Sequence, residues 1–499
     1  MSIKSLAGQT VWYGVSSIAA RFVNYLLTPI ITYSAIVTVA DYGRVNAVYA
    51  MMPLMNVLFT YGMETAYFRF IQNKEIRDKV DNTTSISLLI STVVLSILLW
   101  FNQSFLVGLT SQQAFPQLIT LSVFIIAFDA LSAIPFARLR NEGKPRLYAL
   151  IKVAGILINF GLTVFFILYC PYEYKRTGGN SWVVLFYQPG KNPASYVLTA
   201  NIAQSAFTLL LLFKWLIPKK FSFNAAIWKE MIVYALPMLI AGLGYTVNET
   251  FDRLMLGWWL PPHIAQQQLG IYGACYKLSI LISLFIQAFR LGAEPYFFKQ
   301  AGSNDAPKTY ARVMKFFVLT ITLMFLVVSL YLPVWRYFIS PKYWEGLKIV
   351  PVLLLANMFL GIYINLSIWY KITSKTSAGS VITLIGVVIT FVINWLFIPR
   401  FSYVASAWAT FLCYGTMMIV SYIWGQKNYY IPYALKKLVA YITLVVTLFF
   451  VHYALSSLWN NIPYSLAIAT VLLLFYVWFI SRMERKEFQQ LPVVGKYLK

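Results

Sequence analysis

The sequence predicts an all-α protein that crosses a membrane many times, and three observations support this prediction. Of the 499 residues, 60% are hydrophobic and only 11% are charged. Apolar runs of roughly 20 residues, each long enough to cross ~30 Å of hydrocarbon, recur along the whole chain. Aromatic residues make up 17% of the chain, as expected when Tyr and Trp lie at both lipid–water interfaces.

The apolar runs predict about fourteen spanning helices. Several runs contain Pro or Gly, which a membrane bundle tolerates because neighbouring helices satisfy the freed backbone groups. The expected ranges are 10–37, 45–66, 83–101, 115–137, 147–169, 195–217, 230–258, 269–293, 312–333, 347–370, 378–398, 403–424, 435–455 and 462–481.

The distribution of basic residues predicts the orientation. With the N-terminus inside, the inner loops and the tail from Arg482 to Lys499 hold roughly 28 Lys and Arg, against roughly 9 outside. The outer loops 102–114 and 456–461 hold none. This bias and the even number of spans place both termini in the cytoplasm. Topology therefore accounts for the net charge of +24, and no nucleic acid is expected as a partner.

One motif occurs twice. Glu64-Thr-Ala-Tyr-Phe-Arg69 and Glu294-Pro-Tyr-Phe-Phe-Lys299 each end an apolar segment, and each segment follows a Gly and a Tyr, at Gly43–Tyr49 and Gly270–Tyr276. The offset of about 230 residues indicates a duplicated lobe. Because each copy holds six helices, the two copies have the same orientation and are parallel repeats about an axis along the membrane normal.

The repeat predicts how the chain is divided. We expect a first six-helix lobe at 1–223, a second at 224–428, and an extra helical pair with a basic tail at 429–499. The outer loop 170–194 is unusual, and we expect a hairpin or interfacial segment that packs on the outer rim.

Three cations lie inside predicted spans, where a charge usually faces a cavity or a partner. Arg21 and Lys277 have no acidic residue one helical turn away. Lys152 lies near the inner end of its helix, where it either faces the same cavity or snorkels to the interface. A cavity holding these cations would attract a phosphate or pyrophosphate, because Arg offers a fork of donors and Lys a point charge.

Acidic residues in the spans divide into coupling candidates and structural pairs. Asp129 has no local base and is the first candidate for ion coupling. Glu249, Asp252 and Arg253 share one helical face, which leaves open a Glu249–Arg253 bridge or a cation or proton site on Glu249 and Asp252. The remaining residues are expected in gate or structural ion pairs, with Arg290 and Glu294 forming an inner-gate pair. They are Glu64, Arg253, Arg290, Glu294 and Lys371.

Metal sites and enzyme chemistry are not expected. The three cysteines lie far apart in or beside apolar segments, which predicts neither a disulfide nor a metal site. No phosphate-binding loop or zinc pattern occurs, and both histidines lie near outer ends. We therefore expect no enzyme and no cofactor other than a coupling ion, H⁺ or Na⁺.

Several segments resemble the bacterial polysaccharide-biosynthesis flippases. They are the region from Asp129 to Lys152, Gly270-Ile-Tyr-Gly-Ala-Cys-Tyr-Lys277, Gln287-Ala-Phe-Arg290-Leu-Gly-Ala-Glu294-Pro and Trp369-Tyr-Lys371-Ile-Thr-Ser-Lys375. The resemblance covers essentially the whole chain. It is specific for the O-antigen or lipid-linked-oligosaccharide branch of the multidrug/oligosaccharidyl-lipid/polysaccharide exporter superfamily.

The resemblance implies two six-helix lobes that form a V around a central cavity, with two further helices. It implies transport of an undecaprenyl-pyrophosphate-linked oligosaccharide to the outer leaflet of the bacterial inner membrane, by alternating access driven by a proton or sodium gradient. The family's cavity cations correspond by position to Arg21, Lys152 and Lys277. The implied partners are the lipid-linked oligosaccharide and membrane lipid, with a polysaccharide polymerase and chain-length machinery as further candidates.

Three alternatives remain. A lipid II flippase for peptidoglycan shares the same chemistry. A multidrug or cation antiporter would need an acidic or apolar cavity, against which Arg21 and Lys277 argue. A membrane polymerase or ligase would need large outer loops with catalytic residues, whereas most outer loops here are short.

Overall fold

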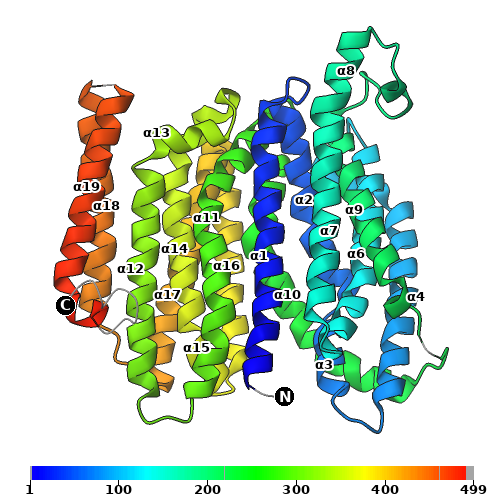
Figure 1. Ribbon diagram of the computed structural model, residues 1–499, viewed down its shortest axis with the longest axis horizontal. Coiled ribbons are helices and arrows are strands. Elements are labelled where there is room, and N and C mark those ends of the chain that lie inside the picture. The colour runs from blue at the N-terminus through cyan, green and yellow to red at the C-terminus, as the bar shows by residue number, and fades with distance from the viewer. Residues whose placement is uncertain (1–2, 219, 460, 490–499) are drawn as a thin grey trace. The chain divides into compact units, whose positions relative to one another are not determined.

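The computed structural model describes residues 3–489 except 219 and 460, and describes side chains from residue 18 onward, except those at 295, 459, 486 and 488. Within this part of the chain the structure is helical and contains no strand (Figure 1). The helices are α1 Ile3–Tyr33, α2 Val39–Thr60, α3 Met63–Phe70, α4 Arg77–Phe101, α5 Gln103–Thr110, α6 Gln117–Asn141, α7 Pro145–Val164, α8 Cys170–Thr177, α9 Pro193–Leu216, α10 Ala225–Trp259, α11 Pro262–Gln300, α12 Ala306–Ser329, α13 Leu332–Trp335, α14 Val350–Leu366, α15 Ile368–Ile372, α16 Thr376–Phe401, α17 Tyr403–Asn428, α18 Leu435–Trp459, α19 Ile462–Met483 and α20 Arg485–Phe488.

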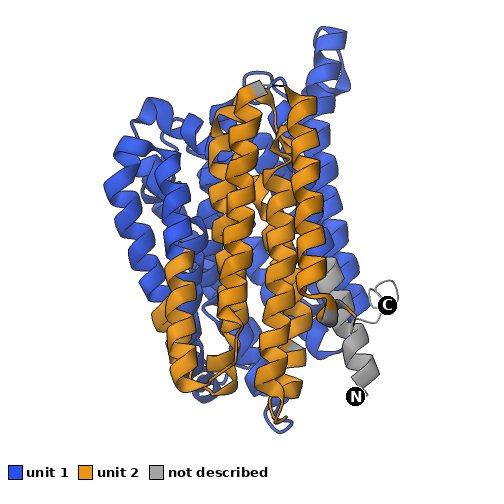
Figure 2. Cartoon of the chain, turned by 90° about the vertical axis from the view of Figure 1, so that its left-hand side faces the viewer, with its two compact units in different colours: residues 1–274, 383–413 blue, residues 275–382, 414–499 orange. Residues whose placement is uncertain are grey.

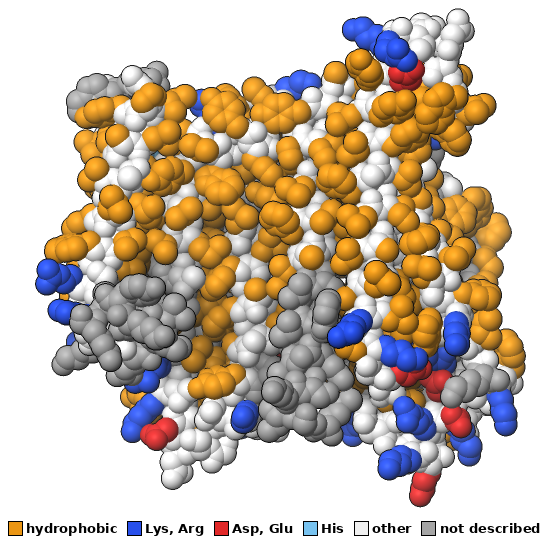
Figure 3. Space-filling view, viewed as in Figure 1, with side chains coloured by type: hydrophobic (Ala, Val, Ile, Leu, Met, Phe, Trp, Pro, Cys, Tyr) orange, Lys and Arg blue, Asp and Glu red, His pale blue; other side chains and the backbone are white. Residues whose placement is uncertain are grey.

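The predicted spanning segments agree with these helices. Twelve helical segments of the described chain are long and apolar enough to cross a membrane, and they match the twelve predicted spans from 83–101 onward. The predicted span 10–37 overlaps α1, which is helical over 31 residues. The predicted span 45–66 overlaps α2, which is helical over 22 residues, and extends into α3. Figure 3 shows hydrophobic side chains over α7, α6, α9 and α4, with charged side chains gathered below them. The chain is thus a multi-pass membrane protein.

Residue contacts divide the chain into two compact units (Figure 2). Unit 1 comprises Met1–Ala274 and Thr383–Cys413, and unit 2 comprises Cys275–Ile382 and Tyr414–Lys499. The predicted lobes follow the sequence repeat whereas the units follow contacts, so the lobe boundaries at 223/224 and 428/429 stay a prediction. The part of the predicted basic tail beyond 489 lies outside the described residues.

The start of α2 is fixed by a capping box. The Thr38 side chain accepts a hydrogen bond from the Asp41 N–H, and the Asp41 carboxylate accepts one from the Thr38 N–H. The same carboxylate receives the Asn192 amide at 2.7 Å, while the Asn192 amide oxygen caps α9 by accepting from the Ala194 N–H. Two helix starts are therefore joined at the predicted outer end of unit 1.

Glycines let α2 and α11 touch within unit 1. A Cβ added at Gly43 would lie 1.8 Å from the main-chain oxygen of Gln266, and one at Gly270 would lie 2.1 Å from that of Val39. Such distances are far inside van der Waals contact, so only glycine fits either position. The two glycines are those that precede the duplicated motif, and each contacts the helix that carries the other.

Arg138, at the end of α6, ties several elements of unit 1 together. Its side chain is 6% exposed and donates through Nε to the Asp81 carboxylate at 2.6 Å and through Nη2 to the Ser85 hydroxyl at 2.7 Å. Its Nη1 donates to the main-chain oxygen of Trp215, in the last turn of α9. The Tyr67 hydroxyl of α3 donates to the same Asp81 carboxylate at 3.2 Å. One buried cation therefore fixes α3, α4, α6 and α9 at the predicted inner end.

A second charge cluster holds the end of the last long helix in unit 2. The Glu484 carboxylate is 3% exposed and accepts from Lys315 at 2.9 Å, Lys437 at 2.9 Å and the Tyr441 hydroxyl at 2.6 Å. Lys315 also pairs with Glu487 of α20 at 3.0 Å. The extra helical pair, α18 and α19, is thereby joined to α12.

We expect Glu484→Gln to reduce the stability of the fold at neutral pH. We also expect it to remove the part of the stability that the unmodified chain loses as the pH falls. Burial raises the pKa of the Glu484 carboxyl, but the hydrogen bonds from Lys315, Tyr441 and Lys437 outweigh burial and hold that pKa below its ordinary value. Such a group stabilises the fold above its unfolded pKa of about 4.3, and the stabilisation disappears as the pH falls through the folded pKa. Melting temperatures in detergent between pH 3 and 7 measure both effects.

The matched control is Asp305→Asn, because the Asp305–Lys308 pair is 74% and 80% exposed and should contribute almost nothing. Identical pH profiles for Glu484→Gln and the unmodified chain would contradict the stabilising role of Glu484.

The loop 170–194 begins as a continuation of α7. A π-helical turn at Phe165–Tyr169 joins α7 to α8, so one helical segment runs from Pro145 to Thr177. The chain then returns, and Trp182 stacks on Phe165 with ring centroids 5.8 Å apart. The returning segment is thus packed against the helix from which it came.

Candidate functional site

A cavity of about 510 Å³ lies within unit 1 among α1, α3, α6, α7 and α9. Three cationic and two acidic side chains line it. They are Arg21, Arg140, Lys152, Glu64 and Asp129. The sequence predicted Arg21 and Lys152 as members of one cationic cavity, and the structure brings them together. Asp129 and Glu64, predicted for other roles, line the same space.

One face of α6 forms a wall of this cavity. Asp129, Ser132, Ala133, Phe136 and Arg140 line it, and their spacing of three or four residues places them on one side of a helix. The same spacing places Tyr148 and Lys152 together on α7, and Gln204 and Thr208 on α9.

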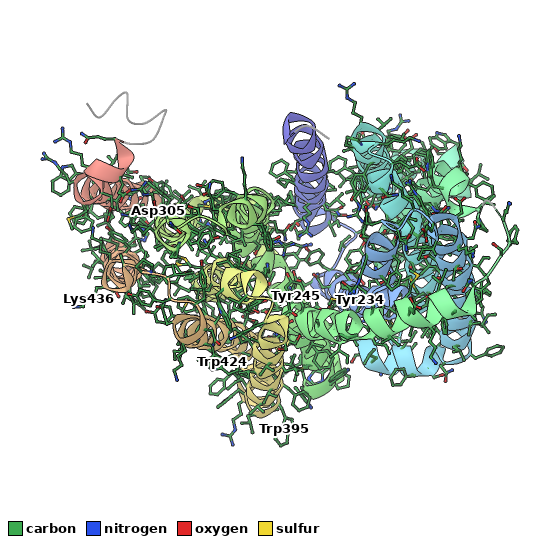
Figure 4. The ribbon with its side chains drawn as sticks, turned by 90° about the horizontal axis from the view of Figure 1, so that it is seen from below. Tyr234, Tyr245, Asp305, Trp395, Trp424 and Lys436 are labelled. Carbon is green, nitrogen blue, oxygen red and sulfur yellow. The ribbon has the colours of Figure 1, made fainter. Side chains whose placement is uncertain are left out.

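The turn between α2 and α3 brings Glu64 to this wall. Tyr61 and Gly62 have φ of 35° and 74°, in the left-handed region, and a Cβ on Gly62 would lie 2.7 Å from the main-chain oxygen of Ala235. The turn ends α2 and starts α3, whose first turn carries Glu64. The Arg69 guanidinium at the other end of α3 lies 4.2 Å from the ring centre of Tyr234 on α10. Figure 4 labels Tyr234.

Aromatic rings hold two of the cavity cations close together. The Arg140 guanidinium lies 4.8 Å from the ring centre of Phe68 and 5.9 Å from that of Tyr148. The Lys152 ammonium lies 5.8 Å from the same Tyr148 ring and 5.0 Å from that of Phe136. Both cations are thus attracted to the ring of Tyr148, which lines the same cavity.

The guanidinium of Arg140 uses only some of its hydrogen-bond donors within the described residues. It forms an ion pair with Glu64, and its buried Nε has no hydrogen-bond partner among the described residues. An unpaired buried donor is costly, so an acceptor from a bound anion would be stabilised there. Arg140 was missed as a site residue because the sequence placed it in a basic inner loop.

We expect Glu64→Gln to strengthen the binding of inorganic pyrophosphate to the purified chain by about tenfold. The change frees Arg140 from its counter-ion, and a hydrogen bond to a charged group is worth about 1.5–3 kcal/mol. Titration calorimetry in detergent measures the dissociation constant.

The repeat supplies the control for this prediction. Glu294→Gln removes the corresponding ion pair of unit 2, with Lys371, and should leave pyrophosphate binding unchanged. Weaker binding by Glu64→Gln would show that Glu64 supports the cavity and does not compete for Arg140.

Asp129 lies half-buried on α6 and accepts a hydrogen bond from the Ser205 hydroxyl of α9 at 2.7 Å. The cavity also contains Lys152 on the adjacent α7, which supplies a cation that the sequence did not place beside Asp129. Its role in ion coupling stays a prediction.

Helical spacing left open a Glu249–Arg253 bridge on α10, and the structure shows which side-chain pair forms there. Arg253 lies 3.7 Å from the Asp252 carboxylate and donates to the main-chain oxygen of Glu249 at 2.8 Å. Asp252 is buried and also accepts from the Tyr272 hydroxyl. The acidic side chain paired with Arg253 is thus Asp252. A coupling role for Glu249 and Asp252 stays a prediction.

The remaining predicted residues lie in unit 2. Lys277 is half-buried on α11, so its membership of a common cavity with Arg21 stays a prediction. The expected Arg290–Glu294 pair is wrong for the described residues, because Glu294 pairs with Lys371 and Arg290 is exposed. Spacing within one helix suggested Arg290, whereas the partner comes from a distant helix.

The pair in unit 2 reproduces the pair in unit 1. Glu294 follows Glu64 by 230 positions, and Lys371 follows Arg140 by 231. Both pairs form in the structure, so the two halves of the sequence contain corresponding ion pairs, each at the predicted inner end.

An entirely apolar cavity of about 360 Å³ lies within unit 2, among α12, α14, α17 and α18. Met314, Leu366, Met418 and Leu438 are among its lining residues. Such a lining suits a hydrocarbon chain and offers nothing to a sugar or phosphate.

Comparisons with known proteins bear on these sites. Residues 6–300 match the family model described as polysaccharide biosynthesis protein, which is more than half of the chain. A comparison with curated proteins gave no match. Among solved structures, the lipid II flippase MurJ in its inward closed conformation is similar with a TM-score of 0.67 and 16% identity, over 95% of this chain and 99% of MurJ.

Transporters of the MATE family are similar as well. An inward-facing multidrug resistance MATE transporter of the MOP superfamily gives a TM-score of 0.54 and 13% identity, over 89% of this chain and 96% of that one. A mutant of the Vibrio cholerae MATE transporter VcmN gives 0.53 and 13%, over 85% and 96%. These likenesses concern the fold and confirm the predicted fold class of an all-α polytopic membrane protein.

Proposed function

Because the chain belongs to the family of polysaccharide biosynthesis proteins, we propose that it is a flippase for an undecaprenyl-pyrophosphate-linked oligosaccharide. The substrate would be a repeat unit of O-antigen, capsule or exopolysaccharide, moved from the cytoplasmic to the outer leaflet of the bacterial inner membrane. The family and the fold are those of transporters and flippases, and not of enzymes.

The observation that carries this proposal is the cluster of Arg21, Arg140 and Lys152 in one cavity of unit 1. A pyrophosphate cannot cross ~30 Å of hydrocarbon without compensation of its charge. The cavity offers two guanidinium forks and an ammonium, the groups that bind phosphate oxygens best. Asn24, Gln204 and Thr208 line the same cavity, and their N–H and O–H groups can donate further hydrogen bonds to phosphate oxygens.

The cycle would be alternating access coupled to a proton or sodium gradient. The diphosphate binds in the cavity from the predicted inner side, while the lipid chain stays in the bilayer. Asp129 lies among the cations and is the residue whose neutralisation by an ion would change the charge of the cavity. Such a change would couple ion binding to binding or release of the diphosphate.

Two other substrates, lipid II and an organic cation, are alternatives that the experiment below distinguishes. The likeness to MurJ favours lipid II as the second candidate, since it too joins a lipid diphosphate to sugars. The fold also occurs in MATE transporters, but the cations of this cavity outnumber its acids, so it suits an organic cation less well than a diphosphate.

The test is flipping of a fluorescent undecaprenyl-pyrophosphate oligosaccharide in proteoliposomes, with and without a proton or sodium gradient. Gradient-dependent arrival in the opposite leaflet would support the proposal and identify the ion. Flipping of lipid II alone would replace the substrate with the peptidoglycan precursor. Uptake of ethidium without any flipping would replace the proposal with a cation antiporter.

A further inference from the structure

A second polar cavity lies within unit 1. It has a volume of about 700 Å³, and its lining comes from the start of α2, the end of α5 and the segment after it, the end of α10 and the start of α11. The residues that matter below are Arg44, Ser111, Gln112, Gln113, Trp258 and Gln266.

The two polar cavities of unit 1 lie at opposite ends of α2. Arg44 stands near the start of this helix and Glu64 just beyond its end. A helix of 22 residues is ~33 Å long, close to the ~30 Å thickness of the hydrocarbon core. Residues 102–116 beside the second cavity include no Lys or Arg, so the positive-inside rule places that cavity at the outer surface.

Two glutamines in this cavity have amide oxygens without a donor. The Gln112 amide nitrogen donates to the Thr110 oxygen at 2.9 Å, and that of Gln266 donates to the Ser111 oxygen at 3.0 Å. Both side chains are held in place, and their buried Oε1 atoms have no hydrogen-bond partner among the described residues. Gln112 is 1% exposed and Gln266 9%, so a donor group that reached either oxygen from the cavity, by displacing its lining slightly, would be strongly stabilised.

The charge of the cavity argues against an anion. Its cation, Arg44, is paired with Asp41 at 2.6 Å and stacks over Phe115 at 4.5 Å. The cavity therefore has no unbalanced positive charge for a diphosphate. Phosphate oxygens at neutral pH mainly accept hydrogen bonds and cannot satisfy amide oxygens, whereas hydroxyl groups donate. Trp258 adds an aromatic wall of the kind on which a sugar ring packs.

Glycine creates this arrangement. Because Gly43 has no side chain, the main chain of α11 at Gln266 reaches α2 beside Arg44. The Ser111 hydroxyl donates to the Gly257 oxygen at 2.9 Å, which holds the segment after α5 against α10. The chain segments that carry the Oε1 atoms of Gln112 and Gln266 are therefore held firmly together.

We propose that this cavity binds the uncharged, polyhydroxylated part of the substrate, the sugar, at the outer surface. This inference rests on the proposed function. The cationic cavity binds the diphosphate at the inner end, and the neutral cavity receives the glycan at the other face. The charged part and the uncharged part of one head group thereby have separate binding sites at opposite faces of the membrane.

The experiment uses the purified full chain and two probes. One probe is the free oligosaccharide released by mild acid from the lipid-linked substrate, without lipid or phosphate, and the other is inorganic pyrophosphate. Gln112→Leu combined with Gln266→Leu should weaken oligosaccharide binding at least tenfold and leave pyrophosphate binding unchanged. Gln113→Leu is the matched control, because Gln113 lines the same cavity but is exposed, and it should bind both probes normally.

A second variant fills the space without disturbing the framework. A Cβ on Gly108 would meet no atom within 4 Å, so Gly108→Trp should block the cavity, abolish oligosaccharide binding and leave the melting temperature unchanged. Full oligosaccharide binding by Gly108→Trp would overturn the proposal, as would absence of oligosaccharide binding by the unmodified chain. Loss of pyrophosphate binding in Arg21→Ala with oligosaccharide binding intact would support separate sites. If neither probe binds, the proposed function fails together with this inference, whereas pyrophosphate binding alone overturns the sugar site only.

Discussion

Arg21→Ala combined with Lys152→Ala is expected to lower the flipping rate of lipid-linked oligosaccharide at least about 100-fold. Both residues line the cationic cavity, and a hydrogen bond to a charged group is worth about 1.5–3 kcal/mol. Two lost contacts amount to at least ~3 kcal/mol, and each 1.4 kcal/mol corresponds to a factor of ten. The variant should still insert in the membrane, because removing one cation from each of two spans makes insertion easier.

The matched control for this double variant is Lys144→Ala. Lys144 belongs to the same basic region but is exposed and pairs with Glu142. It should transport at the normal rate in the same proteoliposomes. Normal flipping by Arg21→Ala with Lys152→Ala, at equal protein content, would exclude the cavity as the diphosphate site.

Asp81→Ala is expected to destabilise the chain by about 3–5 kcal/mol, the largest stability change that we foresee. It leaves the buried Arg138 guanidinium without its carboxylate, and it removes the acceptor of Tyr67. Since Arg138 also holds the ends of α6 and α9, protease sensitivity should increase in the segment between α9 and α10. A shift of the denaturation midpoint of the reconstituted protein measures the change.

The control here is Glu75→Ala. Glu75 lies two residues before α4 and is exposed, so its removal should change the free energy of unfolding by less than about 0.5 kcal/mol. Asp81→Asn separates charge from hydrogen bonding, because an amide oxygen still accepts from Tyr67 while the charge on Arg138 is left uncompensated. Equal stability of Asp81→Ala and the unmodified chain would mean that water compensates Arg138.

The spanning helices could be predicted because lipid imposes a simple rule. A segment that crosses hydrocarbon must satisfy its own backbone and present apolar side chains, so run length alone located them. The turn between α2 and α3 shows the limit of that rule. Residues 45–66 formed one predicted span, yet Tyr61 and Gly62 adopt left-handed backbone angles and separate the helix from Glu64. The apolar run continues through the turn, so hydropathy carries no sign of it.

The sequence predicted Arg21 and Lys152 in the cationic cavity but not Arg140. A comparison of Arg140 with Arg138 shows why. Both occur in one basic run, and the sequence treats them alike. Two residues correspond to about 200° around a helix, so their side chains leave in nearly opposite directions. Arg138 enters a buried network, whereas Arg140 enters the cavity. The helical spacing from Asp129 to Arg140 contains this information, but the apolar run ends near residue 137, whereas α6 continues to Asn141.

The glycine contact between α2 and α11 also bears on the origin of the chain. Gly43 and Gly270 occupy the same place in the two copies of the motif, and each lies against the other's helix. In an ancestor with one copy per polypeptide, a single glycine would have stood on both sides of a two-fold, isologous interface between identical subunits. Fusion of two genes would have kept that interface and freed its halves to diverge. The arginine of the first copy and the lysine of the second, at the inner-end ion pair, are such a divergence.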